Sequence, residues 1–330
     1  MSRFLSLVIA LVTLSAASTP AEPITIDWVT VGDPDNADDD TGYGTVADSY
    51  RIGKYVVTIQ EYTDFLNAVA ATDTYGLYNP FMATDLNIAG IQQNGSSGSF
   101  TYSVIGSGAR PITYVSWFDA ARFANWMQNG QGSGNTETGA YTLAGQTSGT
   151  APAKNSGAQF YIPTEDQWYK AAYYDPTASG GAGGYWDYAT QSNTAPGNTI
   201  SSGANLANIN NGVYSVTQSS FYDASLNYLT DVGAFSGSAS FYGTFDQSGN
   251  VWEWNDLDGT AGTLRGARGG DWVNGAAESS SSGRLSDTSV DTGAFSFRLA
   301  SPVAVPEPSM WVMGLAGLAS AGWGMWRRRK

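Results

Sequence analysis

The sequence predicts one compact, mixed α+β domain with few short helices and strands and many loops. Only 13% of the 330 residues are charged, whereas 13% are aromatic and 40 are glycine. This composition is typical of a compact globular chain and not of a disordered or coiled-coil one. Helix signals are few, and short strand-like runs alternate with Gly/Ser/Asn-rich loops. Because no internal repeat or Pro-rich linker divides the chain, we expect a single domain.

Three capping boxes predict where the helices begin. In each box, a Ser or Thr stands three residues before an Asp, Glu or Gln, so that both side chains can bind free backbone N–H groups. The boxes are Thr58–Glu61, Ser116–Asp119 and Thr164–Gln167, and apolar residues at helical spacing follow the first two. Strands are expected at Tyr50–Val57 and Ala294–Leu299.

Both ends of the chain have the pattern of export signals. Arg3, an apolar run over residues 4–14 and small residues up to Ala21 indicate a secretory signal peptide at 1–21. A buried first helix is the alternative. At the other end, Val-Pro-Glu-Pro-Ser at 305–309 precedes an apolar stretch at 310–326 and a basic tail. That stretch is just long enough to predict a transmembrane helix, with the tail on the cytoplasmic side.

The C-terminal segment, residues 305–330, closely resembles the PEP-CTERM sorting signal of Gram-negative bacteria. The resemblance implies export, transient anchoring in the inner membrane, processing by an exosortase, and a final place at the cell surface or outside the cell. A permanent C-terminal anchor is the alternative. The expected domain is then residues 22–304.

Charge and composition exclude several classes of function. Residues 22–305 contain 10 basic and 28 acidic residues, a net charge of −18, so they have no cationic surface for nucleic acid. An acidic surface suits divalent cations or neutral ligands better than polyanions. The chain contains no Cys and no His. Thiolate nucleophiles, disulfides, imidazole catalysis and Cys- or His-ligated metals are therefore excluded.

Ordered motifs spread along the domain point to one family. They are Tyr50–Thr58, Arg110–Ala121, Tyr161–Trp168, Gly243–Trp254, Arg268–Trp272 and Phe297–Ala300. Together they resemble the sulfatase-modifying-factor family, whose fold is that of the formylglycine-generating enzyme, from about residue 27 to 300. The resemblance implies a C-type-lectin-like α+β domain with little regular secondary structure.

The resemblance does not bring the family's oxidative chemistry with it. The formylglycine-generating enzymes bind copper through two cysteines, and the corresponding positions here are Asn274 and Ser279. Neither an amide nor a hydroxyl can replace a thiolate as a soft Cu(I) ligand, so no copper is expected. A second branch of the family uses a His-ligated iron, and this chain has no His. We therefore expect no catalytic residue of the family's known mechanisms.

Structural calcium is the cofactor that the resemblance does imply. The family's Ca²⁺-binding turn corresponds to Asp246 and Glu253 as side-chain ligands, with the carbonyls of Gly249 and Val251 between them. Two carboxylates around a Gly-containing turn also offer the hard oxygen ligands that Ca²⁺ prefers. In the alternative, Asp246 caps the turn and Glu253 pairs with an arginine. A second site of the family corresponds to three further residues, Asn208, Ile209 and Asp223.

Three further groups of residues have both a functional and a structural interpretation. The acidic run Asp33–Asp40 is either a Ca²⁺ loop or a solvated surface loop. Three tryptophans could stack on sugars or pack in the core, namely Trp252, Trp254 and Trp272. Three carboxylates could supply a hydrolase pair, namely Glu165, Asp166 and Asp271.

Taken together, these features predict an exported, non-catalytic binding or extracellular-matrix-associated protein on a calcium-stabilised fold. Two alternatives belong to other classes. One is an oxidoreductase or other enzyme that uses the family pocket with altered residues. The other is a Ca²⁺-dependent lectin that binds an extracellular polysaccharide.

Overall fold

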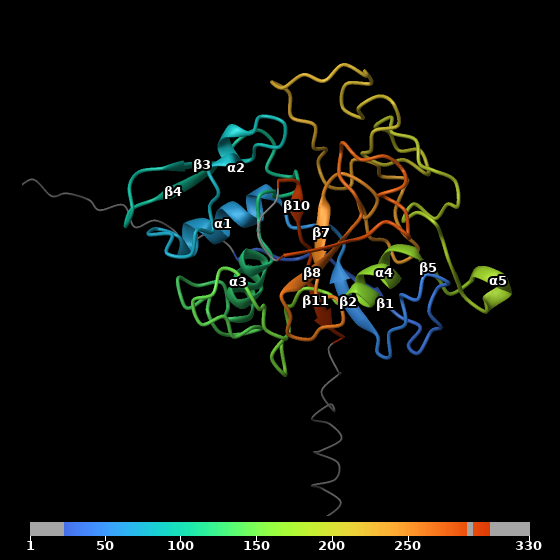
Figure 1. Ribbon diagram of the computed structural model, residues 1–330, viewed down its shortest axis with the longest axis horizontal. Coiled ribbons are helices and arrows are strands. Elements are labelled where there is room, and N and C mark those ends of the chain that lie inside the picture. The colour runs from blue at the N-terminus through green and yellow to red at the C-terminus, as the bar shows by residue number, and fades with distance from the viewer. Residues whose placement is uncertain (1–22, 289–292, 304–330) are drawn as a thin grey trace, which may run out of the picture.

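The computed structural model of the protein describes residues 23–288 and 293–303 (Figure 1). Its helices are α1 (Ile59–Val69), α2 (Phe81–Thr84), α3 (Trp117–Gln128), α4 (Glu165–Tyr173) and α5 (Ala178–Gly181). Its strands are β1 (Trp28–Val31), β2 (Tyr50–Gly53), β3 (Ile91–Asn94), β4 (Thr101–Val104), β5 (Tyr174–Asp175), β6 (Gly184–Tyr185), β7 (Trp252–Asn255), β8 (Leu264–Arg268), β9 (Leu285–Thr288), β10 (Phe295–Ser296) and β11 (Ala300–Pro302). Long stretches of turn and loop connect these short elements.

Two small sheets form the centre of the domain. One has the strand order β10-β7-β8-β9, in which β10 runs parallel to β7 and the other pairs are antiparallel. The other has the order β1-β2-β11, so the two ends of the domain pair with the same strand. In Figure 1, β7 and β8 lie between α1 and α3 on one side and α4 on the other. This mixed architecture with little regular structure agrees with the predicted α+β class.

The side chains of β7 alternate between two cores, as expected for a strand that is covered on both faces. Trp252 and Trp254 pack into the main apolar cluster with α1 and α3. Glu253 points the other way and accepts a hydrogen bond from Trp168 of α4. Both faces of β7 are therefore buried, and an acidic side chain lies inside the protein.

All three predicted capping boxes are present. Thr58, Ser116 and Thr164 are the N-caps of α1, α3 and α4, and each makes both of the expected reciprocal hydrogen bonds. Each box satisfies free N–H groups at the start of its helix, which explains why these sequences start helices reliably.

The strand predictions were too long. The predicted strand Tyr50–Val57 ends at Gly53 as β2, because the chain bends at Lys54 and Tyr55. Of the predicted strand Ala294–Leu299, only Phe295–Ser296 forms a strand, β10, and the next strand, β11, begins after it at Ala300 and pairs in a different sheet. The chain has to leave one sheet and enter the other, so one continuous strand cannot form.

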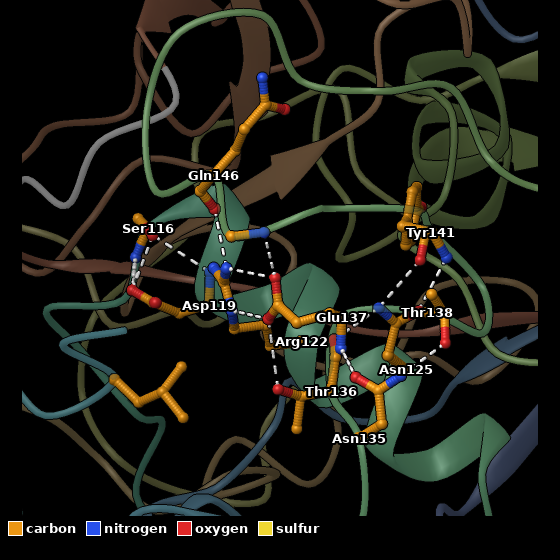
Figure 2. Close-up of polar contacts among 12 residues, drawn as sticks. Ser116, Asp119, Arg122, Asn125, Asn135, Thr136, Glu137, Thr138, Tyr141 and Gln146 are labelled. Atoms are coloured by element: carbon orange, nitrogen blue, oxygen red, sulfur yellow. Dashed lines mark hydrogen bonds and ion pairs between the residues drawn. The ribbon is translucent and has the colours of Figure 1, made fainter. Parts of the chain in front are cut away.

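A buried ion pair fixes the long loop that follows α3 (Figure 2). Arg122 of α3 is fully buried, and its guanidinium binds both oxygens of Glu137 at 2.7 and 3.1 Å. One turn further along α3, Asn125 donates to the carbonyls of Thr136 and Tyr141. These side chains donate hydrogen bonds to backbone carbonyls of the loop that have no partner in a helix or a sheet.

Within residues 23–288 and 293–303, every helix is too short or too polar to cross a membrane. The signal peptide predicted at residues 1–21 and the apolar helix predicted at 310–326 lie outside the described residues.

Candidate functional site

The two positions that carry cysteines in the formylglycine-generating enzymes lie in the loop after β8. The side-chain oxygen of Asn274 accepts a hydrogen bond from the backbone N–H of Asp271 at 2.9 Å. Ser279 is fully buried and donates to the carbonyl of Gly275 at 3.1 Å. Both side chains therefore close the loop onto itself.

Asp271 holds the same loop from its other side. Its carboxylate accepts hydrogen bonds from the backbone N–H groups of Val273 and Asn274, both at 3.1 Å. Burial nevertheless raises its pKa to about 6. A carboxylate in a loop turn with a raised pKa is a candidate acid or base by itself. Asp271 belongs to no group of three or more acidic, His or Cys residues that could hold a metal among residues 23–288 and 293–303.

The predicted calcium turn begins at Asp246, which has a left-handed backbone with φ of 61°. One of its carboxylate oxygens accepts a hydrogen bond from the N–H of Gly233 at 2.7 Å. The other oxygen accepts none from the described residues, and burial raises the pKa of Asp246 to about 6. Further along the turn, Gly249 is required, because a Cβ at this position would lie 2.3 Å from the carbonyl oxygen of Asn208.

Glu253, the second carboxylate of that turn, is fully occupied by the protein. Arg298 binds both of its oxygens at 2.6 Å, and the indole of Trp168 adds a third hydrogen bond at 2.8 Å. Arg298 also donates to the carbonyl of Phe245 at 2.9 Å. The side chains of both ion-pair partners are 0% exposed. The pairing with an arginine that the sequence left as an alternative is present.

These contacts decide how well the turn fits Ca²⁺. Asp246 fits, because one oxygen of a desolvated carboxylate has no protein donor. Glu253 does not fit as the charged ligand, because the guanidinium of Arg298 already neutralises it and would repel a second cation nearby. Calcium at Asp246 with the carbonyls of Gly249 and Val251 stays a prediction.

The residues predicted for a second calcium site are not brought together. Asn208 donates through its amide to the carbonyl of Tyr228, whereas the backbone N–H of Asp223 bonds to the hydroxyl of the same tyrosine. The carbonyl of Ile209 accepts from Asn198 at 3.0 Å. The Tyr228 side chain therefore separates Asn208 from Asp223, whose carboxylate binds Ser225 instead.

An aromatic face lies next to the same loops; we define it by Tyr222, Tyr228 and Trp272. The three rings are nearly parallel, with angles of 8 to 10° between their planes. Trp272 and Tyr228 are buried, whereas Tyr222 is 47% exposed and its neighbour Phe221 is 74% exposed. A ring held flat by two buried rings is pre-organised for stacking on a ligand.

The structure also decides the remaining groups that the sequence left open. The tryptophans at 252, 254 and 272 are all buried, so their interpretation as core residues is confirmed. In the acidic run, Asp33 and Asp39 accept hydrogen bonds from the hydroxyls of Tyr174 and Tyr169. The run therefore packs on α4 and β5 as a surface loop. Both carboxylate oxygens of Glu165 are bound by arginines, so the protein already occupies this member of the predicted hydrolase pair.

The comparisons with known proteins agree with this geometry. The sequence profile of the sulfatase-modifying factor enzyme 1-like domain matches residues 29–302. The chain belongs to this family. The profile of the PEP-CTERM protein-sorting motif matches residues 304–330 of this sulfatase-modifying-factor domain protein. The motif marks it for export in Gram-negative bacteria and for processing by an exosortase.

Three solved structures are similar to this sulfatase-modifying-factor domain protein. The structure of CarF is 19% identical, covers 84% of this chain and 99% of its own, and has a TM-score of 0.50. PvdO from Pseudomonas aeruginosa is 18% identical, with coverages of 84% and 92% and a TM-score of 0.41. Treponema denticola variable protein 1 is 17% identical, with coverages of 84% and 95% and a TM-score of 0.44. No curated protein matches the chain significantly. The family match and the CarF structure confirm the predicted formylglycine-generating-enzyme-like fold.

Sequence reasoning missed the exposed part of the site. Tyr222 and Tyr228 lie in an irregular loop, about 50 residues before Trp272, so no periodicity links the three rings. The one available signal was the adjacent aromatic pair Phe221 and Tyr222 in an otherwise polar segment.

Proposed function

We propose that this exported protein is a non-catalytic binding or extracellular-matrix-associated protein. The observation that carries the proposal is the state of the two cysteine positions, where Asn274 and Ser279 make loop-closing hydrogen bonds. Neither side chain is a soft ligand for copper, and the chain has no Cys or His elsewhere. The site can therefore shape a surface, but it lacks the groups of the family's oxidative reactions.

A peptide assay tests the proposal against the oxidoreductase alternative. The purified protein is incubated with Cu(I), oxygen and a Cys-Thr-Pro-Ser-Arg peptide, and the peptide mass is followed over time. We expect the thiol to stay intact at the level of the no-protein control. Formation of an aldehyde-bearing peptide above that control would contradict the proposal.

We further propose an extracellular polysaccharide as the ligand, because the aromatic face is exposed at Tyr222 and backed by Tyr228 and Trp272. Sugars stack their apolar faces on such rings, and an acidic domain favours neutral over anionic polymers. Structural Ca²⁺ at Asp246 belongs to this proposal as a stabiliser of the neighbouring turn.

A glycan array with and without EDTA tests this ligand. We expect binding that Tyr222→Ala removes and that Tyr222→Phe retains, because the phenylalanine keeps the ring and loses only the hydroxyl that binds Asn87. Phe241→Ala is the matched control, since Phe241 is also partly exposed and does not belong to the aromatic face. Equal binding by Tyr222→Ala and the wild type would exclude the face as the sugar site.

A further inference from the structure

A cavity of about 500 Å³ lies where the N-terminal end of α4 meets the loop between β7 and β8. Tyr43, Asp166, Asp258 and Arg284 are among its lining residues. None of its lining residues belongs to the aromatic face or the calcium turn, and only Arg284 comes from the β8–β9 loop, five residues after Ser279. A concave site of this size, with a few converging polar groups, is typical of small-ligand binding.

Two carboxylates of the cavity have hydrogen-bonding capacity to spare. Asp166 accepts one hydrogen bond, from the N–H of Gly44 at 2.9 Å. Asp258 accepts from the N–H and the hydroxyl of Thr260, both through one oxygen. Among the described residues, the second oxygen of each carboxylate has no donor. Both can therefore accept hydrogen bonds from a ligand.

The cavity also contains positive charge, which is held in place by the protein. Glu165 binds Arg268 and Arg284 at the cavity wall, at 2.8 to 2.9 Å. The guanidinium groups of the same two arginines lie 4.6 and 5.3 Å from the ring centre of Tyr43. Arg284 is fixed in this way and still 35% exposed at its side chain, so it presents donors to the cavity.

Apolar surface completes the lining. Leu257 and Leu264 line the cavity together with the ring of Tyr43, and Leu264 is 44% exposed. Thr260 and Thr263 are also among the lining residues. The cavity thus combines acceptors, donors and apolar surface within a small volume.

We propose that this cavity binds one neutral sugar residue of a polysaccharide. Sugar hydroxyls can donate to Asp166 and Asp258 and accept from Arg284, while the apolar face of the ring contacts Tyr43 or Leu264. An anionic ligand would meet two carboxylates, and a cationic ligand would meet the guanidinium of Arg284. The inference rests on the proposed binding function and adds a second subsite, away from the aromatic face.

Calorimetric titration of the exported protein with neutral tetrasaccharides tests the inference. The probes are cellotetraose, maltotetraose and mannotetraose, and tetragalacturonate is the anionic comparison. We expect a neutral probe to bind, and Asp166→Ala to weaken it about tenfold, as expected for a lost hydrogen bond to a charged group. Thr263→Trp, at an exposed position of the cavity wall, should also abolish binding by filling the space. Asp187→Ala is the control, because Asp187 is exposed and lies outside the cavity lining.

The outcomes separate this inference from the proposed function. Melting curves first establish that each variant is folded. Equal binding of a neutral probe by the wild type, Asp166→Ala and Thr263→Trp would overturn the proposal that the cavity binds sugar. If only Tyr222→Ala loses the probe, the aromatic face is the sugar site. Binding of tetragalacturonate alone, or of no probe, would overturn the inference as well. The peptide assay stays an independent test of the non-catalytic function.

Discussion

Replacing Glu253 by glutamine should destabilise the protein through Arg298 and not through a metal. Glutamine keeps one oxygen for the guanidinium or for Trp168, but its amide group places N–H donors against the donors of Arg298. Both side chains of the ion pair are fully buried. Removing one partner of such a pair typically costs about 3–5 kcal/mol, because the other charge is left buried without compensation.

For a domain of this size, about 2 °C per kcal/mol converts that cost into a decrease of about 6–10 °C in melting temperature. The assay is thermal unfolding followed by circular dichroism, with every sample measured in EDTA and again in excess Ca²⁺. Glu278→Gln serves as the control, because Glu278 is exposed and forms no ion pair within the described residues. We expect the control to shift the melting temperature by about 1 °C or less, as surface substitutions usually do.

Two results would refute this reasoning. A decrease of less than about 2 °C would show that the pair contributes little to stability. A decrease that is present in Ca²⁺ and absent in EDTA would assign Glu253 to a metal and not to Arg298. The double variant Glu253→Leu/Arg298→Met provides a further check, since removing both charges should cost less than leaving one unpaired.

Three other predictions follow from the same contacts. Calcium at Asp246 should stabilise the protein by about 2.7 kcal/mol when Ca²⁺ is at a hundredfold excess over Kd, so EDTA should lower the melting temperature by roughly 5 °C. Asp246→Asn should remove that difference. Equal melting curves of the wild type with and without EDTA would contradict the calcium site. The folded pKa of Asp271, about 6 against a usual 3.8, gives a stability contribution that is complete below pH 3.8 and is lost as pH rises through 6. Between pH 4 and 7, the free energy of unfolding measured in urea should therefore fall less in Asp271→Asn than in the wild type. The same fall in both proteins would refute the raised pKa of Asp271. Glu137→Gln should lower the melting temperature less than Glu253→Gln, because Glu137 is 15% exposed and water can reach its ion pair with Arg122. The same melting assay measures the two decreases, and equal decreases would contradict this reasoning.

Helix starts were predictable because their chemistry is local. Each capping box uses two side chains three residues apart, so the sequence alone contains both partners. The β3–β4 hairpin was missed, because β3 has a single apolar residue in Ile-Gln-Gln-Asn and each strand is only four residues long, although Thr-Tyr-Ser-Val in β4 does alternate. The length of the last predicted strand was overestimated because β10 ends, and β11 begins, where the chain changes sheets, which is a tertiary constraint.

The candidate site divides in the same way. Asn274 and Ser279 could be placed from a motif, and their loss of the family chemistry follows from residue type alone. The partner of Glu253 could not be placed, because Arg298 is 45 residues away in the chain. The same holds for Glu165, whose partner Arg284 lies 119 residues further on. Contacts at this separation depend on the complete fold and leave no periodic signal.

The buried arginines also determine how the protein meets other surfaces. Four fully buried arginines form internal ion pairs, and Lys170 is buried as well. Half of the 10 basic residues of residues 22–305 are thus withdrawn from the exterior. The surface therefore keeps an excess of acidic over basic side chains, and anionic cell-surface lipids repel it over roughly 10 Å at 0.1 M salt. At lower ionic strength this repulsion reaches further, and added salt should shorten its range.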